Sequence, residues 1–305
     1  MRTDESKFEA FDRSRRRLFN IAYRMLGTRD DAEDVVQEAY IRWHDSDDAL
    51  IVTPEAWLVT VTTRLAIDRL RKAAADRERY IGPWLPEPLV ADPTRSPEEE
   101  AEFASDLSLA FMAMLERLSP VERAAFILHD VFDVEYPEIA RIVGKTEAAS
   151  RQMIHRARER VRSGRSRFRA SDEERIGLIR KFAAASFAGD ETQLMALFAD
   201  DVALTSDGGG KITAARKVIT GKRKIAHLFA ITASKNREHL DFRIVDVNGE
   251  IGAVDLYKGK PFAVTSFTVD DGKISAIYRV MNPDKLKAFA ETGRENNFGA
   301  VSQNT

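Results

Sequence analysis

The spacing of hydrophobic residues changes once along this 305-residue chain, and the change divides it into two kinds of structure. Up to about residue 198, apolar side chains recur every three or four positions, as on amphipathic helices. Beyond that point they alternate with polar ones, as in strands that bury one face. The last four predicted strands are 240–247, 251–257, 262–269 and 274–280, and Asn248-Gly249, Lys258-Gly259-Lys260 and Asp271-Gly272 between them are typical hairpin turns. We therefore predict a multidomain protein, with all-α domains followed by an α+β domain that carries an antiparallel sheet.

Three helices are predicted before residue 80. Gly27 is placed to end the first helix, and Thr28 can cap the second. The second helix has one apolar face and one acidic face, and the acidic face contains Asp31, Asp34 and Glu38. Pro54 opens the third helix, because proline loses no hydrogen bond at the first helical position.

A proline-rich segment, residues 81–96, follows these helices. Its prolines exclude a helix and favour an extended linker. Trp84, Leu85 and Leu89 within it are apolar and gain by burial. We expect Trp84 to anchor the linker to one of the domains.

The next block, residues 97–170, is predicted to be helical. The capping-box pattern at residues 96–99 predicts a helix to about Leu118, and Ser119 opens another. A short helix to Gly144 and a longer one from Thr146 to Val161 form a helix-turn-helix pattern. On the longer helix, Ala149, Met153, Ala157 and Val161 are predicted to face inward.

The outer face of that last helix carries groups that suit DNA. Arg151, Gln152, His155 and Arg158 lie along it, and Gln and Arg can each make paired hydrogen bonds to base edges. Arg156 suits a phosphate. Although the formal net charge is only −2, residues 141–169 contain ten Lys and Arg against two acids, a local balance of +8. A basic helical hairpin exposed to solvent is the alternative, but the charge block favours a DNA partner.

These motifs together resemble the extracytoplasmic-function sigma factors of the sigma-70 superfamily. Residues 31–40 (DAEDVVQEAY) resemble their polymerase-binding helix, which implies that Asp31, Asp34 and Glu38 bind core RNA polymerase. The following helix resembles the one that melts promoter DNA and recognises the minus-ten element. The resemblance implies DNA binding by Trp57, Arg64, Arg71 and Lys72, in addition to Arg151, Gln152, His155, Arg156 and Arg158 at the minus-thirty-five element.

A narrower resemblance, to the sigma-J-like subgroup, covers the rest of the chain. It rests on Trp84-Leu85-Pro86-Glu87-Pro88-Leu89, Asp207-Gly208-Gly209-Gly210-Lys211 and Asn282-Pro283-Asp284-Lys285-Leu286. The resemblance implies a C-terminal SnoaL-like cone that acts as a fused regulator and has a pocket with room for an unidentified small-molecule ligand. From the residues alone, the three glycines fit either a bulged turn or an interdomain or ligand contact with Lys211.

The domain boundaries follow from these observations. We predict sigma region two at 1–80, the linker at 81–96, region four at 97–170, the SnoaL-like domain at 171–292 and a disordered tail at 293–305. The chain has no cysteine, no signal-peptide pattern and no run of roughly 18 apolar residues that could span a membrane. We expect a cytoplasmic protein that is monomeric when free and needs no metal or cofactor.

Several alternatives remain at this stage. The acidic face could simply be solvated, and Trp57 could be a core residue instead of stacking on an unpaired base. SnoaL-like folds also include enzymes that abstract a proton next to a carbonyl, for which Asp207, His227 or Asp255 would be the candidates. A plain DNA-binding repressor is a third hypothesis, but it would need neither a polymerase-docking nor a melting helix. We predict a transcription initiation factor and not an enzyme.

Overall fold

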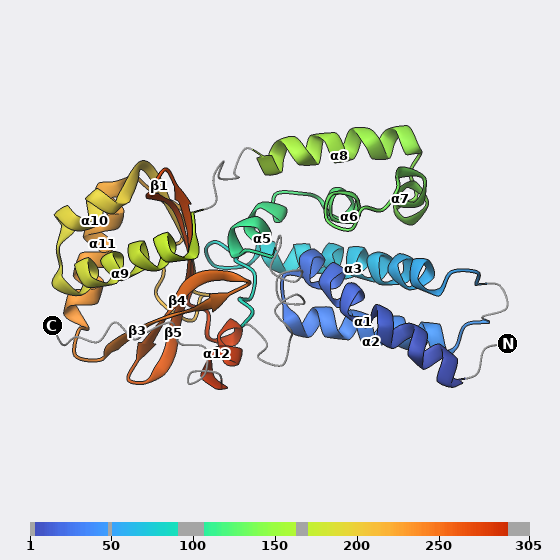
Figure 1. Cartoon of the computed structure of the whole chain (residues 1–305), viewed down its shortest axis with the longest axis horizontal. Helices are drawn as coiled ribbons and strands as arrows, with labels where there is room; N and C mark the ends of the chain where they lie inside the picture. The colour runs from blue at the N-terminus through green and yellow to red at the C-terminus, as the bar shows by residue number, and fades with distance from the viewer. Residues whose placement is uncertain (1–3, 48–50, 91–106, 163–169, 292–305) are drawn as a thin grey trace. The chain divides into compact units, whose positions relative to one another are not determined.

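The computed structural model describes residues 4–47, 51–90, 107–162 and 170–291 (Figure 1). The predicted capping box at 96–99, most of the basic stretch at 162–169 and the predicted disordered tail lie outside these ranges. The chain forms two compact units. One comprises residues Met1–Arg79 and Met112–Gly164, and the other comprises Tyr80–Phe111 and Arg165–Thr305.

The first unit begins with three helices that pack on one another, α1 (Asp4–Leu26), α2 (Arg29–His44) and α3 (Pro54–Glu78). Their shared core includes Leu18, Ile21 and Trp43, none of which has exposed surface. Thr28 occupies the N-cap position of α2, but the prediction that its side chain caps the helix is wrong. Its hydroxyl donates instead to the Asp31 carboxylate at 2.5 Å, and accepts no hydrogen bond from the backbone of α2.

The second half of this unit contains α6 (Pro120–Asp130), α7 (Tyr136–Val143) and α8 (Glu147–Arg162). The predicted capping box at Ser119 is confirmed, since its hydroxyl accepts from the Glu122 N–H and the Glu122 carboxylate accepts from the Ser119 N–H. The α6 helix packs on α1, where the fully buried Arg123 donates to the Arg24 carbonyl oxygen at 2.7 Å and pairs with Glu116.

The helix expected to run to Leu118 is shorter. Within the described residues it is α5 (Leu109–Leu115), which crosses the boundary between the two units. Leu107 and Ser108 are not helical, and the Ser108 hydroxyl accepts from the Phe111 N–H as a helix start does. The helix α5 therefore begins after Ser108, and one uninterrupted helix from residue 96 to Leu118 is ruled out.

The helix-turn-helix pattern is confirmed. Gly144 ends α7 in the left-handed conformation, at φ 67°, and Thr146 accepts from the Ala149 N–H at the start of α8. The inner face of α8 differs by one position from the prediction, because Ala149 is exposed and Ser150 is buried in its place. The helical period explains the buried face, which consists of Ser150, Met153, Ile154, Ala157 and Val161. Ala149 lies at the edge of this face and is exposed.

The second unit contains a six-stranded sheet, in the order β2-β1-β6-β5-β4-β3. The strands are β1 (Phe198–Asp207), β2 (Ile219–Thr220), β3 (Leu240–Val247), β4 (Glu250–Tyr257), β5 (Lys260–Asp270) and β6 (Lys273–Val280). The predicted meander from β3 to β6 is antiparallel, and β1 runs parallel to β6, so the sheet is mixed. Both residues of each hairpin turn, at 248–249, 258–259 and 271–272, have positive φ, which is why glycine follows Asn, Lys and Asp there.

Two helices, α9 (Asp172–Ala188) and α11 (Lys222–Lys235), pack against the sheet, and α10 (Glu191–Leu197) packs on both of them (Figure 1). In the sequence, the capping-box pattern Ser171-Asp172-Glu173-Glu174 predicts a helix that ends at Gly189, and a second helix is predicted at 191–198. The structure confirms both as α9 and α10, whereas no sequence pattern predicted α11 or the short β2. The space between helices and sheet is filled by apolar side chains that include Phe182, Phe198, Phe229 and Phe267. After β6, a 3-10 turn at Pro283–Lys285 and α12 (Lys287–Glu291) end the described chain.

Candidate functional surfaces

The outer face of α8 presents most of the predicted DNA-binding groups to solvent. Arg151, Gln152, His155 and Arg156 are exposed, and Arg158 is half-buried. The opposite face of α8 is buried, so the amphipathic pattern of the helix gathers the five DNA-binding candidates on its exposed side. Such a surface can approach a DNA major groove, which admits an α-helix.

Two arginines on this face contact neighbouring side chains that restrict their conformations. The Arg151 guanidinium lies 4.6 Å from the Tyr136 ring centroid and pairs with Glu147 one turn earlier. Arg158 donates to Asp130 on α6 at 2.6 Å, and this hydrogen bond raises the pKa of the Arg158 guanidinium. Ring stacking and ion pairing restrict the rotamers of long side chains, which lowers the entropy that they lose on binding a partner.

The predicted DNA-binding residues of α3 have different environments. Trp57 is half-buried and packs against Trp43, with 5.5 Å between ring centroids, so it is neither fully core nor fully free. Arg71 is exposed and pairs with Asp68, and Lys72 is exposed. Arg64 instead donates to the backbone carbonyl oxygens of Ile142 and Arg141, at 3.1 and 3.0 Å, at the end of α7.

The acidic face of α2 is partly occupied by cations of the same unit. Arg69 on α3 donates to Asp31 and Asp34, each at 2.7 Å, and so links the two carboxylates. Glu38 pairs with Arg42 one turn later, at 2.6 Å. All three carboxylates keep solvent-exposed surface, since Asp31, the least exposed, retains 39% of its side-chain area. The face is therefore accessible, but a basic partner would compete with Arg69 and Arg42.

The linker and two motifs of the C-terminal domain meet around one buried ion pair. Lys285, 6% exposed, donates to Asp207, which has no exposed surface, at 2.8 Å. The same ammonium donates to the Leu85 carbonyl oxygen, and Asp207 accepts from the Leu85 N–H at 2.9 Å. The Lys285 ammonium also lies 3.9 Å from the Trp84 ring centroid. We call this arrangement of residues 80–89, 207–211 and 282–286 the linker cradle.

Tyr80 extends the linker cradle at one end. Its hydroxyl donates to Asp207 at 2.6 Å and accepts from the Asn282 amide at 3.0 Å. Burial, together with the hydrogen bond to the Asp207 carboxylate, raises the pKa of the Tyr80 hydroxyl far above its ordinary value, so it remains a donor. At the other end, Leu89 and Asn248 exchange two hydrogen bonds, of 2.8 and 2.9 Å.

The three glycines permit the close approach of these segments. A Cβ on Gly209 would lie 2.4 Å from the Asn282 side chain, and one on Gly208 would lie 2.4 Å from the Ile212 carbonyl oxygen. A Cβ on Gly210 would lie 3.0 Å from Ile81 of the linker. The glycines therefore form a turn, in which the Lys211 backbone N–H donates to the Gly208 carbonyl oxygen, and this turn packs on the linker through Gly210. The Lys211 side chain pairs with Asp284, so the alternative contact through Lys211 stays a prediction.

The remaining motif residues have structural positions around the linker cradle. Pro86 and Leu286 are buried, while Pro283 is exposed at the start of the 3-10 turn. Lys211 and Asp284 form an exposed pair at 2.5 Å. Sequence reasoning missed Tyr80 and Asn248: Asn248 was recognised only as a turn residue, and nothing local marks Tyr80 as a partner of residues 127 and 202 positions away.

The three residues that would have served an enzyme do not form one site. Asp207 is committed to the linker cradle, and His227 is exposed beside Glu191 at 2.7 Å. Asp255 pairs with Arg279, whose guanidinium also donates to Thr265. No helix among the described residues combines the length and hydropathy that a membrane crossing requires.

Two family models match the chain, "Sigma-70 region 2" at residues 10–75 and "Sigma-70, region 4" at residues 108–161. The ECF RNA polymerase sigma factor SigJ of Mycobacterium tuberculosis is 40% identical over 293 residues, which cover 92% of each chain. The ECF sigma factor SigE of Mycolicibacterium smegmatis is 34% identical over 148 residues, covering 48% of this chain and 56% of SigE.

A solved structure extends the similarity to the fold. The crystal structure of M. tuberculosis SigJ has a TM-score of 0.73 and 35% identity to this chain, covering 92% of it and 98% of SigJ. The predicted fold, helical sigma domains followed by a SnoaL-like α+β domain, is therefore confirmed. On the similarity of sequence and structure alike, the chain belongs to the ECF RNA polymerase sigma factors, which are transcription initiation factors and not enzymes.

Proposed function

We propose that this sigma factor binds core RNA polymerase through the acidic face of α2 and promoter DNA through α3 and α8, and that its C-terminal domain restrains both sigma domains by holding the linker. Family membership supports the partners, core polymerase and promoter DNA. Exposure of the α8 cations and of the α2 carboxylates supports the assignment of the surfaces.

The observation that carries the regulatory part is the linker cradle. A buried Lys–Asp pair is stabilising only when further hydrogen bonds satisfy both ions, and here the backbone of Leu85 supplies one to each. Release of the linker would leave both ions with fewer partners, so the domain favours the bound linker. Because residues 80–89 connect the predicted sigma regions two and four, holding them shortens the chain that can span these regions.

The sign of the effect follows from Arg64. Its Nε and Nη2 groups donate to the carbonyl oxygens of α7, so two of its five N–H donors are not free for a phosphate or base edge in this arrangement. Promoter binding that uses all donors of Arg64 would therefore favour the separation of α3 and α7. A linker that limits separation acts as a brake, which we propose as the function of the C-terminal domain.

Run-off transcription with core polymerase tests this proposal. The variant Tyr80→Phe/Trp84→Ala removes the hydroxyl and the ring that hold the linker, and leaves the sheet and its helices unchanged. We expect more transcript from it than from the wild type, and faster hydrogen exchange at residues 80–89. The control, Lys211→Ala, breaks an exposed pair that does not touch the linker. Faster exchange with unchanged transcription would refute the brake.

A further inference from the structure

One segment of the C-terminal domain concentrates positive charge. Residues 211–235 contain seven Lys and Arg residues and no Asp or Glu. Three of these cations, Lys222, Arg223 and Lys224, form the first turn of α11, which has no acid and no side-chain cap. Cations are disfavoured there, because the N-terminus of a helix already carries partial positive charge.

Part of this charge is neutralised by the protein and part is not. Lys222 pairs with Asp200 at 2.6 Å. Lys217 and Lys224 make no hydrogen bond or ion pair with any residue that the structure describes. Both line an open groove of about 500 Å³ between α11 and the segment that contains β2.

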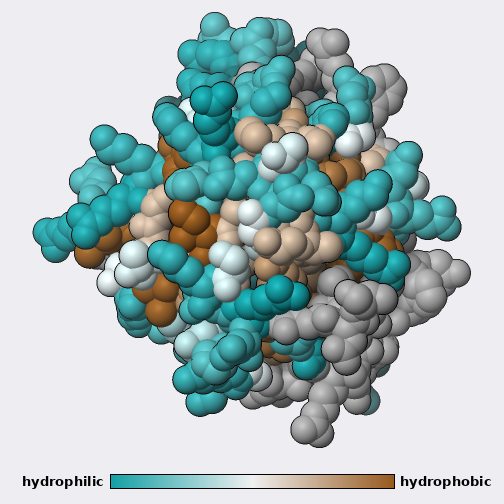
Figure 2. All heavy atoms as spheres, turned by 90° about the vertical axis from the view of Figure 1, so that its left-hand side faces the viewer, coloured by the Kyte–Doolittle hydropathy of each residue, from teal (hydrophilic) through white to brown (hydrophobic). Residues whose placement is uncertain are grey.

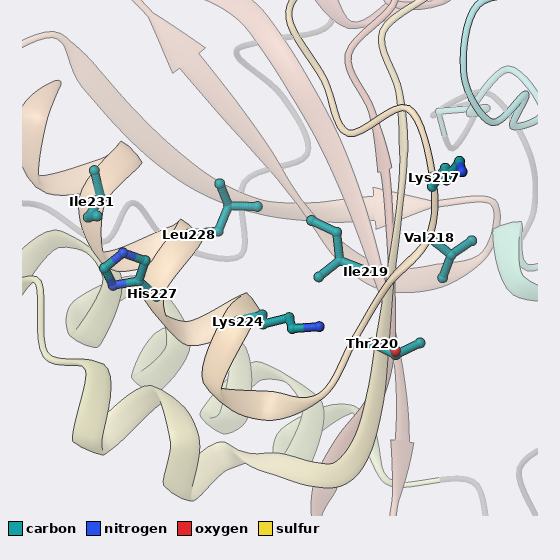
Figure 3. A pocket seen from close by; sticks show the side chains of 8 residues that line it. All are labelled: Lys217, Val218, Ile219, Thr220, Lys224, His227, Leu228 and Ile231. Carbon is teal, nitrogen blue, oxygen red and sulfur yellow. The ribbon is translucent and has the colours of Figure 1, made fainter.

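The floor of this groove is apolar. Val218 and Ile219 contribute from the β2 segment, and Leu228 and Ile231 from α11. Figure 3 shows the Lys224 side chain reaching from the first turn of α11 toward Ile219, with Leu228 between helix and strand. Val218 is 51% exposed, which is high for valine. On the end of the C-terminal domain that carries α9, α10 and α11, hydrophobic patches interrupt a hydrophilic surface (Figure 2).

The groove is separate from the interior of the cone. The side of α11 that faces the core carries Ile225, Ala226, Phe229 and Ala230, all buried. The side that lines the groove carries Lys224, His227, Leu228 and Ile231, at the spacing of a neighbouring helical stripe. A ligand of this groove would therefore leave the aromatic core in place.

We propose that this groove binds a small amphipathic anion, of the class of medium-chain carboxylates. The apolar chain would lie on Ile219 and Leu228, and the carboxylate would lie at the Lys224 ammonium group, with Lys217 lining the same groove. The volume falls within the range of about 300–1,000 Å³ that small-molecule sites occupy. A nucleic-acid backbone would use the cations but not the apolar floor, so the combination favours an amphiphile.

Calorimetric titration of the full chain with octanoate, decanoate and dodecanoate tests the site. Saturable binding is expected for at least one of them, with 1-octanol and acetate each binding more weakly. The variant Lys217→Glu/Lys224→Glu should weaken binding by about tenfold or more. Val218→Asp, at an exposed position, should weaken it as well.

The matched control is Arg223→Glu/Lys235→Glu, which makes the same charge change on the same domain at exposed positions outside the groove. It should change the affinity by less than about twofold. Two outcomes of this titration would overturn the proposal: no saturable binding of any carboxylate, or equal losses of carboxylate affinity in both double variants. A parallel titration with non-specific duplex DNA gives a third: if Lys217→Glu/Lys224→Glu weakens DNA binding but leaves carboxylate affinity unchanged, the proposal is also wrong. The titration needs no polymerase, so its result is independent of the regulatory proposal.

Discussion

At the scale of the residue, Asp207 carries the most informative environment in the C-terminal domain. Its carboxylate has no exposed surface and accepts from Tyr80, Leu85, Gly209 and Lys285. In a sequence, an aspartate before three glycines could equally be a catalytic base or a turn residue. The donors around it assign it to holding the linker, because a carboxylate with four donors has no lone pair left for a substrate proton.

The first prediction concerns this ion pair. Asp207→Ala should lower the free energy of unfolding of the C-terminal unit by about 3–5 kcal/mol, because it leaves the buried Lys285 ammonium unpaired. Denaturant titration measures the loss. Asp284→Ala is the control: it breaks a pair that is more than half exposed and should cost less than about 1 kcal/mol. Similar losses in the two variants would contradict the assignment.

The second prediction separates steric from conformational effects at glycine. Gly259 has φ 76° and nothing within 4 Å of an added Cβ, so Gly259→Ala should cost only the left-handed penalty of about 1–2 kcal/mol. Gly209 has φ 61°, and its Cβ would also overlap Asn282. Gly209→Ala should therefore lower the melting temperature clearly more than Gly259→Ala does. Equal melting temperatures would mean that the linker cradle tolerates the displacement of Asn282.

At the scale of the element, α8 combines a buried stripe with an exposed polar one. The third prediction is that Arg151→Ala/Gln152→Ala/His155→Ala weakens promoter binding by the polymerase holoenzyme and relaxes preference at the upstream element. Loss of a base-contacting side chain costs about 1–3 kcal/mol. Lys181→Ala, an exposed cation on α9, serves as the control in a gel-shift titration. Unchanged binding by the triple variant would leave this face merely solvated.

The helix α2 carries the fourth prediction. Charge reversal at its acidic face, Asp31→Lys/Asp34→Lys/Glu38→Lys, should weaken binding to core polymerase, since the carboxylates are exposed enough to meet a basic surface. Titration of labelled core enzyme measures the affinity, and circular dichroism verifies that the helices persist. Glu173→Lys, exposed in the first turn of α9, should leave core affinity unchanged. Equal affinity of wild type and triple variant would mean that Arg69 and Arg42 are the only partners of this face.

At the scale of the whole molecule, the C-terminal domain and the linker belong to one compact unit, while most of the two sigma regions belongs to the other. The fifth prediction follows from this division. Truncation before Asn282 removes Lys285 and the Asn282 amide from the linker cradle, and should raise promoter-specific transcription relative to the full chain. Deletion of residues 172–305 should do the same. A run-off assay in which neither truncation changes the transcript level would contradict the brake.

Local patterns in the sequence were sufficient for most elements. Serine before a Pro-x-Glu or Asp-x-Glu pattern predicted the starts of α6 and α9, and the x-Gly pairs predicted three hairpin turns, because caps and turns depend on residues only a few positions apart. The helix-turn-helix motif and its exposed basic face followed from the helical period alone. These features, with the motifs, were enough to predict a sigma factor with a C-terminal α+β domain.

Only the tertiary structure decided what the motifs contact. Asp207 and Lys285 are 78 positions apart and form one buried ion pair, and the backbone of Leu85, 122 positions before Asp207, hydrogen-bonds to both ions. Arg64, expected to bind DNA, is engaged by carbonyl oxygens 77 and 78 positions away. The α11 helix and its groove were missed, because a helix with three cations in its first turn lacks the usual start signals. Such contacts depend on how separate segments pack, and the free energy of packing is set by burial and by pairing of distant groups, which no local pattern encodes.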